Sequence, residues 1–187
     1  MSSPMKKQKV VAIVGMPGAG KGFVSNAAKA RGMPVFVCGD VIREETARRG
    51  LPPSPENMGV VMLDIRQQEG PSVVAERLIP KLEASPSGVA IVEGVRSMDE
   101  VSALRRNHSV VIAAVHASPE TRFNRLLRRA RGDDPKSWDE FVDRDLRELR
   151  VGIGNVIALA QEMLINERSA EDFQVVSEHL ISKVTAK

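Results

Sequence analysis

The sequence predicts an α/β fold in which a parallel sheet of five strands is flanked by helices. Two observations support this prediction. Strand-like apolar runs alternate with helix-like segments along the whole chain, and a glycine-rich segment, GMPGAGKG, directly follows the apolar run Val10–Val14. With 187 residues, of which 42% are hydrophobic, the chain is long enough for one such core. We therefore expect residues 1–187 to form a single domain.

The strands and helices can be placed in order along the chain. The expected strands are apolar runs of the kind found when both faces of a parallel sheet are covered, namely Val10–Val14, Val35–Cys38, Val89–Glu93, Val110–His116 and Met163–Asn166. Three helix starts are marked by a serine at the capping position, at Ser97, Ser118 and Ser137. Helical patterns separated by LPPSP and EGPS fill residues 41–84. We expect this interval to be a small helical insertion.

Composition limits the classes of protein and partner. The single cysteine, Cys38, excludes an intramolecular disulfide. No apolar stretch approaches the ~18 residues of a membrane span, and no leader segment is recognised before the first strand, so we expect a cytoplasmic protein without a membrane partner. The net charge of +3 allows a nucleotide or a nucleic acid. Because the chain has no tyrosine and few other aromatic residues, we do not expect nucleic acid.

The glycine-rich segment has the features of a phosphate-binding P-loop. Its glycines let the backbone curl so that N–H groups point at an anion, and the helix that follows adds its positive end. Lys21 is then expected to reach the β- and γ-phosphates of ATP as a catalytic residue. Gly22 stands where a P-loop usually has serine or threonine to hold magnesium. The expected ATP-binding residues are Gly15, Met16, Pro17, Gly18, Ala19, Gly20, Lys21, Gly22 and Phe23.

Two carboxylate and arginine pairs follow predicted strands, at the edge where open α/β sheets bind ligands. Asp40 precedes Arg43 by three residues, and Glu93 precedes Arg96 by three. A carboxylate can hold the water ligands of Mg²⁺ or accept a proton, and an arginine can hold a phosphate by two parallel hydrogen bonds. The alternative is a set of surface ion pairs and helix-start acids.

Residues 122–134 are expected to form a short, arginine-rich lid. Arg122, Arg125 and Arg129 recur at helical spacing and predict one cationic helix face, and Arg131 stands in the following loop. Arginines that close over a phosphoryl-transfer site stabilise the transferred group and exclude water. One of three arginines on the next helix, Arg144, Arg147 and Arg150, is expected to face the site. The alternatives are a solvated basic face or an RNA-binding surface.

These motifs, in this order, resemble those of adenylate kinase and its nucleoside monophosphate kinase relatives over nearly the whole chain. Those enzymes also have glycine after the P-loop lysine, and the resemblance implies that Asp40 and Glu93 orient the water ligands of Mg²⁺. It further implies that Arg43 and Arg96 bind the acceptor phosphate. Arg125, Arg129, Arg131 and Arg144 correspond to the catalytic arginines of the lid. The segment QEMLINERS, which contains Asn166, is similar to dephospho-CoA kinase. The complete pattern resembles archaeal adenylate-kinase-related proteins.

The chain also departs from the adenylate kinase pattern. Phe23 replaces a threonine, the EGVR segment lacks one residue and the proline of the usual spacing, and no adenosine-recognition sequence is present. We therefore expect a kinase for a small nucleotide-like acceptor, most simply a nucleoside monophosphate, with ATP and Mg²⁺. One alternative is dephospho-CoA kinase, for which Asp40 would accept the proton of a ribose hydroxyl. The other is a nucleotide-dependent switch or accessory ATPase that acts on RNA or a protein.

Overall fold

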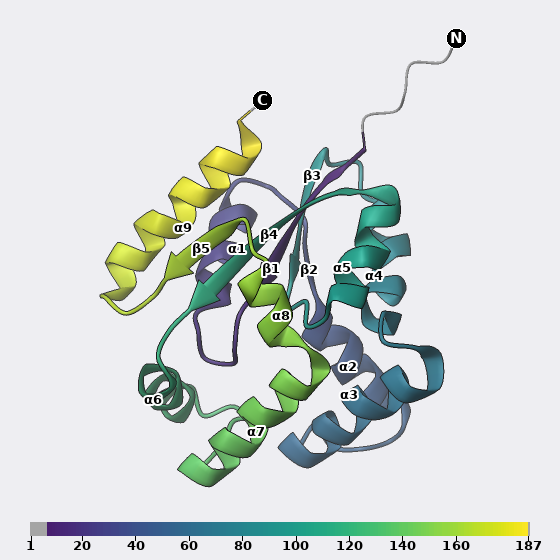
Figure 1. Cartoon of the computed structure of the whole chain (residues 1–187), viewed down its shortest axis with the longest axis vertical. Helices are drawn as coiled ribbons and strands as arrows, with labels where there is room; N and C mark the ends of the chain where they lie inside the picture. Colours follow the sequence, from purple (N-terminus) through teal and green to yellow (C-terminus); the bar gives the residue numbers. More distant parts are fainter. Residues whose placement is uncertain (1–6, 187) are drawn as a thin grey trace.

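The computed structural model describes residues 7–186 and has a central parallel β-sheet (Figure 1). Its five strands lie in the order β2-β3-β1-β4-β5, and every neighbouring pair is parallel. The strands are β1 (Lys9–Val14), β2 (Val35–Val37), β3 (Val89–Glu93), β4 (Ser109–His116) and β5 (Glu162–Ile165). The predicted fold class is therefore confirmed.

Helices cover both faces of the sheet, which explains why its strands are apolar throughout. Side chains that alternate along β1 enter two separate cores, Val11 and Ile13 on one face and Val10, Ala12 and Val14 on the other. The helices α1 (Lys21–Ala30) and α9 (Ala170–Thr185) cover the first face, and α4 (Val73–Glu83), α5 (Met98–Asn107) and α8 (Ile153–Ala158) cover the second. The three predicted serine caps are confirmed, because each accepts a hydrogen bond from the backbone N–H three residues later.

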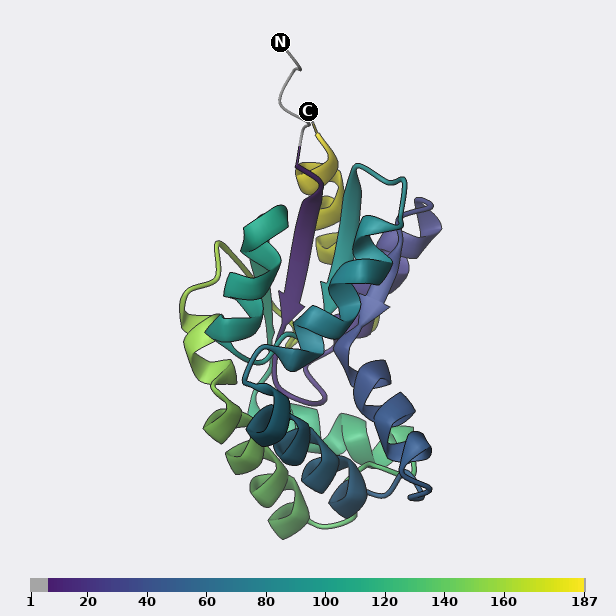
Figure 2. The same cartoon turned by 90° about the vertical axis from the view of Figure 1, so that its right-hand side faces the viewer.

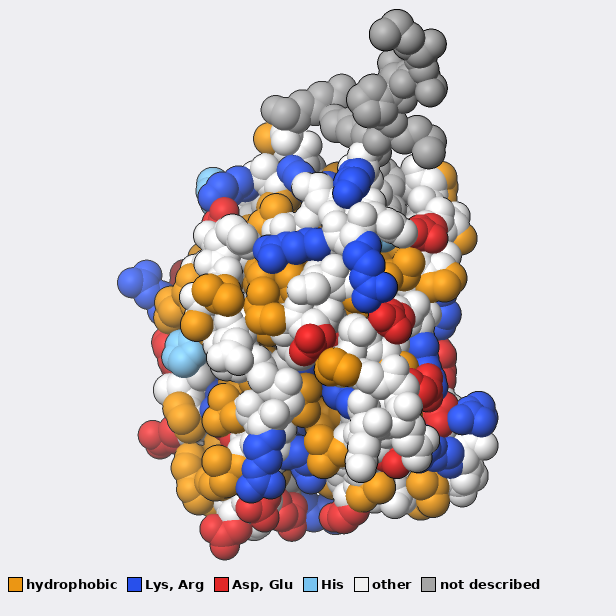
Figure 3. Space-filling model, turned by 45° about the vertical axis from the view of Figure 1, so that its right-hand side comes forward, with side chains coloured by type: hydrophobic (Ala, Val, Ile, Leu, Met, Phe, Trp, Pro, Cys, Tyr) orange, Lys and Arg blue, Asp and Glu red, His pale blue; other side chains and the backbone are white. Residues whose placement is uncertain are grey.

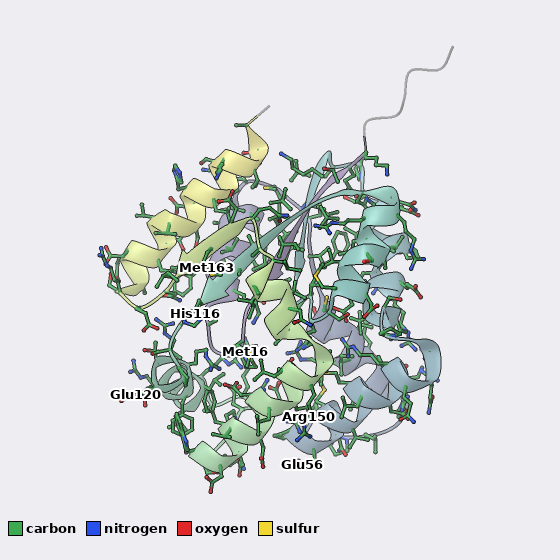
Figure 4. The ribbon with its side chains drawn as sticks, viewed as in Figure 1. Met16, Glu56, His116, Glu120, Arg150 and Met163 are labelled. Atoms are coloured by element: carbon green, nitrogen blue, oxygen red, sulfur yellow. The ribbon has the colours of Figure 1, made fainter. Side chains whose placement is uncertain are left out.

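The position of β1 determines where the site lies. It is the central strand, with β3 on one side and β4 on the other. A crevice forms at the carboxyl edge of a sheet where strand order reverses in this way. Met16, just after β1, and His116, at the end of β4, lie near this edge (Figure 4). The loops that follow β1, β3 and β4 consequently meet there.

Four further helices lie beyond this edge. The helices α2 (Cys38–Arg48) and α3 (Pro55–Glu69) precede α4 in the chain, and α6 (Pro119–Arg129) and α7 (Trp138–Val151) follow β4. Both views of the ribbon show α3 and α7 side by side (Figures 1 and 2). Three helices thus occupy the expected insertion at 41–84, although α4 packs on the sheet while α2 and α3 extend from it. The expected lid at 122–134 comprises most of α6 and part of the segment leading to α7.

Two expected strand ends are off by one residue. Cys38 begins α2 and Asn166 follows β5. Cys38 is buried as a small apolar side chain, and burial raises the pKa of its thiol. None of the helices between residues 7 and 186 combines the length and apolar character of a membrane-spanning helix.

Candidate active site

Residues 15–20 form a loop between β1 and α1, and at some of its positions the backbone conformation requires glycine. Gly18 and Gly20 have φ angles of 82° and 103°, in the left-handed region. A Cβ on Gly18 would lie 2.7 Å from the carbonyl oxygen of Arg122, and one on Gly20 would collide with the side chain of Asn166. Among residues 7–186, apart from the chain neighbours and the backbone of α1 itself, no atom lies within 4 Å of a Cβ built on Gly22. Glycine is therefore required at positions 18 and 20 by the backbone conformation and by neighbouring atoms, whereas it is not required at position 22.

The side chain of Lys21 lies inside this loop. Its ammonium donates hydrogen bonds to the carbonyl oxygens of Gly15 at 2.7 Å and Met16 at 3.3 Å. Burial lowers the pKa of Lys21 to about 8, although the nearby carboxylate of Glu93 opposes that shift. An ammonium that is held by carbonyl groups and lies near the carboxylates of Glu93 and Glu148 is well placed to bind a phosphate.

Glu93 lies at the end of β3 and accepts a hydrogen bond from the hydroxyl of Ser25. Sequence reasoning missed Ser25, although it lies one helical turn after Lys21 and therefore on the same side of α1. A carboxylate and a hydroxyl beside a phosphate-binding loop are oxygen donors of the kind that Mg²⁺ accepts together with water and phosphate. Glu93 and Ser25 therefore fit a magnesium site.

Asp40 has a different partner from Glu93. Its carboxylate accepts a hydrogen bond from Arg43 at 2.6 Å, and its side chain is 57% exposed. The backbone of α2 directs Gly39 and Arg43, but not Asp40, into the cleft described below. The structure thus brings Glu93 to Lys21, and it places Asp40 in an exposed ion pair.

Arg96 and Glu148 separate two cavities. Arg96 donates to Glu148 at 2.5 Å from Nε and 3.3 Å from Nη2. Both side chains line a small cavity with Gly15, Pro17 and Lys21. They also line a cleft of about 540 Å³ between α2, α3 and α7. The ion pair therefore connects the P-loop to the cleft.

Glu148 was not identified from the sequence, although it follows Arg144 by four residues on α7 and so shares its helix face. Burial opposes its ionised form, yet Arg96, Arg144 and Lys21 hold the pKa of its carboxyl below the usual range. Burial likewise opposes the charge on Arg96, but Glu148 more than offsets this effect and raises the pKa of Arg96. Both groups are therefore charged.

The cleft combines an apolar wall with a surplus of arginines. It is lined by Gly39, Ile42, Arg43, Pro55, Met58, Gly59, Met62, Arg96, Asp133, Arg144, Arg147 and Glu148. Four arginines thus face two carboxylates. The structure brings together Arg43 and Arg96, the two expected acceptor-binding arginines. On the face shown in Figure 3, cationic and anionic side chains are intermixed.

One buried carboxylate, that of Asp134, contacts part of the predicted lid and the following helix. Asp134 accepts two hydrogen bonds from the guanidinium of Arg129 and one from the backbone N–H of Arg131. Arg144 donates to the carbonyl oxygen of Asp133 at 2.7 Å and lies 3.5 Å from Asp134. These bonds outweigh burial and hold the pKa of Asp134 below its usual range. Asp134 thus organises three of the predicted catalytic arginines, while the Arg131 side chain is exposed.

Arg122 does not form a cationic face with Arg125 and Arg129, so that part of the interpretation was wrong. Arg122 is buried beneath the P-loop, where it donates to the carbonyl oxygen of Pro17 at 3.2 Å and forms a two-bond ion pair with Asp145. Arg125 donates to the side chain of Asn166 at 3.1 Å. The helical spacing showed that these arginines share one side of α6. It could not show which of their side chains are exposed to solvent, because that depends on the packing of α6 against the rest of the protein.

Comparisons with known proteins agree with this architecture. Residues 14–142 match the family described as "AAA domain". Among solved structures, the chain is similar to TT1252 from Thermus thermophilus, with 19% identity, a TM-score of 0.62, and coverage of 97% of this chain and 100% of that one. It is also similar to shikimate kinase from Bacteroides thetaiotaomicron, with 18% identity, a TM-score of 0.62, and coverage of 95% and 98%. The fold is therefore that of the P-loop kinases.

Archaeal relatives are much more similar in sequence. The UPF0200 protein of Hyperthermus butylicus is 47% identical over 95% of this chain and 96% of its own length. UPF0200 protein PH1008 of Pyrococcus horikoshii is 46% identical over 94% of this chain and 97% of its own. The chain therefore belongs to the AAA domain family and to the UPF0200 proteins.

Proposed function

We propose that the protein is a kinase that transfers the γ-phosphoryl group of ATP to a small nucleotide-like acceptor, as in the adenylate kinase superfamily. The observation that carries this proposal is the ion pair of Arg96 and Glu148, which lines both the P-loop cavity and the arginine-lined cleft. A donor phosphate beside Lys21 and an acceptor in the cleft would then meet at this pair. Two solved proteins with the same fold, a shikimate kinase and a gluconokinase, are named as kinases of small molecules, which supports phosphoryl transfer as the activity.

The residues around the P-loop suggest how transfer would proceed. Backbone N–H groups of residues 15–22 would bind the ATP phosphates, and Lys21 would exchange its carbonyl partners for the β- and γ-oxygens. Mg²⁺, when bound, would neutralise charge on the β- and γ-phosphates, and Glu93 and Ser25 would hold it directly or through water. Arg125, Arg129, Arg131 and Arg144 would stabilise the transferred group once the lid closes.

The acceptor we favour is a nucleoside monophosphate. A phosphate acceptor is already a nucleophile and needs only to be positioned, whereas a ribose hydroxyl also needs a base. Glu148 is a weak base because neighbouring cations lower the pKa of its carboxyl, and Asp40 is paired with Arg43 outside the cleft lining. Arg43 and Arg96 would hold the accepting phosphate, and Ile42, Met58 and Met62 would contact the nucleoside.

The test is ATP consumption by the purified protein against nucleoside monophosphates, dephospho-CoA and RNA. We expect a monophosphate to accelerate turnover, and Lys21→Met to reduce it by about 10²–10³-fold. Arg43→Ala and Arg96→Ala should each raise the acceptor KM, at a cost of roughly 2–4 kcal/mol in binding free energy, with little change in the binding of ATP. If only dephospho-CoA is phosphorylated, the acceptor is a hydroxyl group and not a monophosphate. If only RNA stimulates ATP consumption, the protein is an RNA-dependent ATPase and the kinase proposal is wrong.

Asp40→Asn separates the two acceptor classes further. With a phosphate acceptor, Asp40 would act only through the water ligands of Mg²⁺, so excess Mg²⁺ should restore part of the lost activity. With a hydroxyl acceptor it would be the base, and the loss should persist at every Mg²⁺ concentration and depend on pH. The measurement is turnover across an Mg²⁺ titration at two pH values.

A further inference from the structure

The guanidinium of Arg147 lies against the backbone of α3. It extends from α7 into the cleft, and a Cβ built on Gly59 would lie 2.8 Å from its Nη1, 3.0 Å from its Cζ and 3.2 Å from its Nε. These distances place the guanidinium flat against the helix at the one residue of α3 that has no side chain. The glycine therefore creates the space in which this cation lies, and the side-by-side course of α3 and α7 brings the two together (Figures 1 and 2).

Arg147 differs from the other arginines of the cleft in its bonding. Each of those has a carboxylate partner: Arg43 bonds Asp40, Arg96 bonds Glu148, and Arg144 pairs with Asp133 and Asp134. Within residues 7–186, the guanidinium of Arg147 has neither a hydrogen bond nor an ion pair. A half-buried cation without a hydrogen-bonded partner loses hydration, and the charge of nearby Glu56 offsets part of that loss until an anion arrives. Its free donors are therefore available to a ligand.

The position of Arg147 also differs from that of Arg96. Arg96 lines both the P-loop cavity and the cleft. Arg147 and Arg144 line both the cleft and an outer cavity, and neither lines the P-loop cavity. The outer cavity also carries four carboxylates, those of Glu56, Asp133, Glu140 and Asp143. An anion at Arg147 would thus lie on the outer side of the cleft, away from the point where a phosphoryl group would be transferred.

We infer that Arg147, whose guanidinium lies against Gly59, forms a subsite for a second anionic group of the acceptor. This second group is separate from the group that receives the phosphoryl group. This inference rests on the proposed kinase function and narrows its substrate class to nucleotides with two separated anionic groups, such as nucleoside bisphosphates. Arg96 and Arg43 hold the accepting group, Met58 and Met62 contact the nucleoside, and Arg147 holds the second anion by charge-assisted hydrogen bonds.

Equilibrium binding tests the subsite without requiring turnover. Calorimetry is performed on the full chain with a non-hydrolysable ATP analogue filling the P-loop, and the probes are adenosine 5′-monophosphate, adenosine 2′,5′-bisphosphate and adenosine 3′,5′-bisphosphate. We expect the wild type to bind at least one bisphosphate about tenfold or more tightly than the monophosphate. Arg147→Ala should abolish that preference and leave the affinity for the monophosphate almost unchanged.

Gly59→Ala provides a second variant that retains every charge. The added methyl group displaces the Arg147 guanidinium, and because alanine favours a helix the fold is retained, as thermal unfolding can verify. It too should abolish the preference. The control is Arg150→Ala, which removes a cation from an exposed position of the same helix (Figure 4) and should preserve it.

Two results would overturn the inference. The first is equal affinity of the wild type for all three probes. The second is an equal loss of affinity for the monophosphate and the bisphosphates in Arg147→Ala, because Arg147 would then bind the phosphate that all three probes share. The kinase proposal fails differently. If the wild type prefers a bisphosphate and the two variants lose that preference, yet no acceptor accelerates ATP consumption, the subsite stands and the phosphotransfer does not.

Discussion

Arg96 and Glu148 are joined by two hydrogen bonds, at 2.5 and 3.3 Å, although 52 residues separate them in the chain. Arg96 follows β3 and its backbone N–H is held by Glu100 at 2.7 Å, whereas Glu148 belongs to α7. The pair therefore fixes α7 to the sheet edge. Any shift of α7 changes the position of Arg96 beside the P-loop.

A double-mutant cycle measures this connection. Glu148→Gln or Arg96→Gln alone leaves a buried charge without its partner, and each should lower the free energy of unfolding by about 3–5 kcal/mol. The double variant should cost clearly less than the sum, because neither charge is then left unpaired. The measurement is urea unfolding. Lys183 and Glu162, an exposed pair at 2.6 Å, provide the control, with an expected coupling below about 1 kcal/mol. Additive losses at Arg96 and Glu148 would contradict the prediction.

The pKa of Lys21 predicts how ATP binding depends on pH. Because this pKa is lowered to about 8, the free protein carries a charged Lys21 below pH 8 and a neutral one above it. ATP affinity should be constant from pH 6.5 to 7.5, at a saturating Mg²⁺ concentration, and should weaken by up to about tenfold per pH unit above 8. Lys21→Met should bind weakly and without this dependence. A constant wild-type Kd up to pH 9.5 would show that Lys21 stays charged.

Ser25 and Glu93 are expected to set the magnesium requirement. Glu93→Gln removes the carboxylate charge beside Lys21, and Ser25→Ala removes the hydrogen bond that orients it. Both should raise the Mg²⁺ concentration needed for half-maximal ATP turnover, Glu93→Gln by more, because a charged ligand contributes more than an orienting hydroxyl. Ser177→Ala, a buried serine on α9, is the control. Unchanged magnesium titrations for both variants would place the metal elsewhere.

Two glycines of the loop should respond to alanine in opposite ways. Gly20→Ala forces a side chain into the left-handed region at φ 103° and against Asn166, at a cost of about 1–3 kcal/mol. Gly22→Ala lies in α1 with open space around it and should stabilise the protein by about 0.5–1 kcal/mol. Thermal unfolding of both variants provides the measurement. Similar losses would mean that Gly22 is required for a reason other than backbone geometry.

Local chemistry explains why so much of the fold could be predicted. The serine caps, the P-loop and the apolar strands depend on residues only a few positions apart, so their signals are readable in order. Glu148 and Arg147 act through contacts with residues 52 and 88 positions away, which no spacing on α7 reveals. Arg122 was misassigned for the same reason, since helical spacing cannot show that the P-loop lies over that part of α6. Two signals were nevertheless available from the sequence, because Ser25 follows Lys21 by four residues on α1 and Glu148 follows Arg144 by four residues on α7.

Asn166 has a consequence for how the protein is made. Its side chain donates to the carbonyl oxygen of Ala19 at 2.8 Å, across 147 residues of chain, and accepts from Arg125. At ~5–20 residues per second, a ribosome adds Asn166 roughly 7–30 s after Ala19. During that interval, the nucleotide loop lacks the residue that braces it. A nucleotide that binds only the braced loop therefore stabilises the finished chain and gives no protection to the growing one.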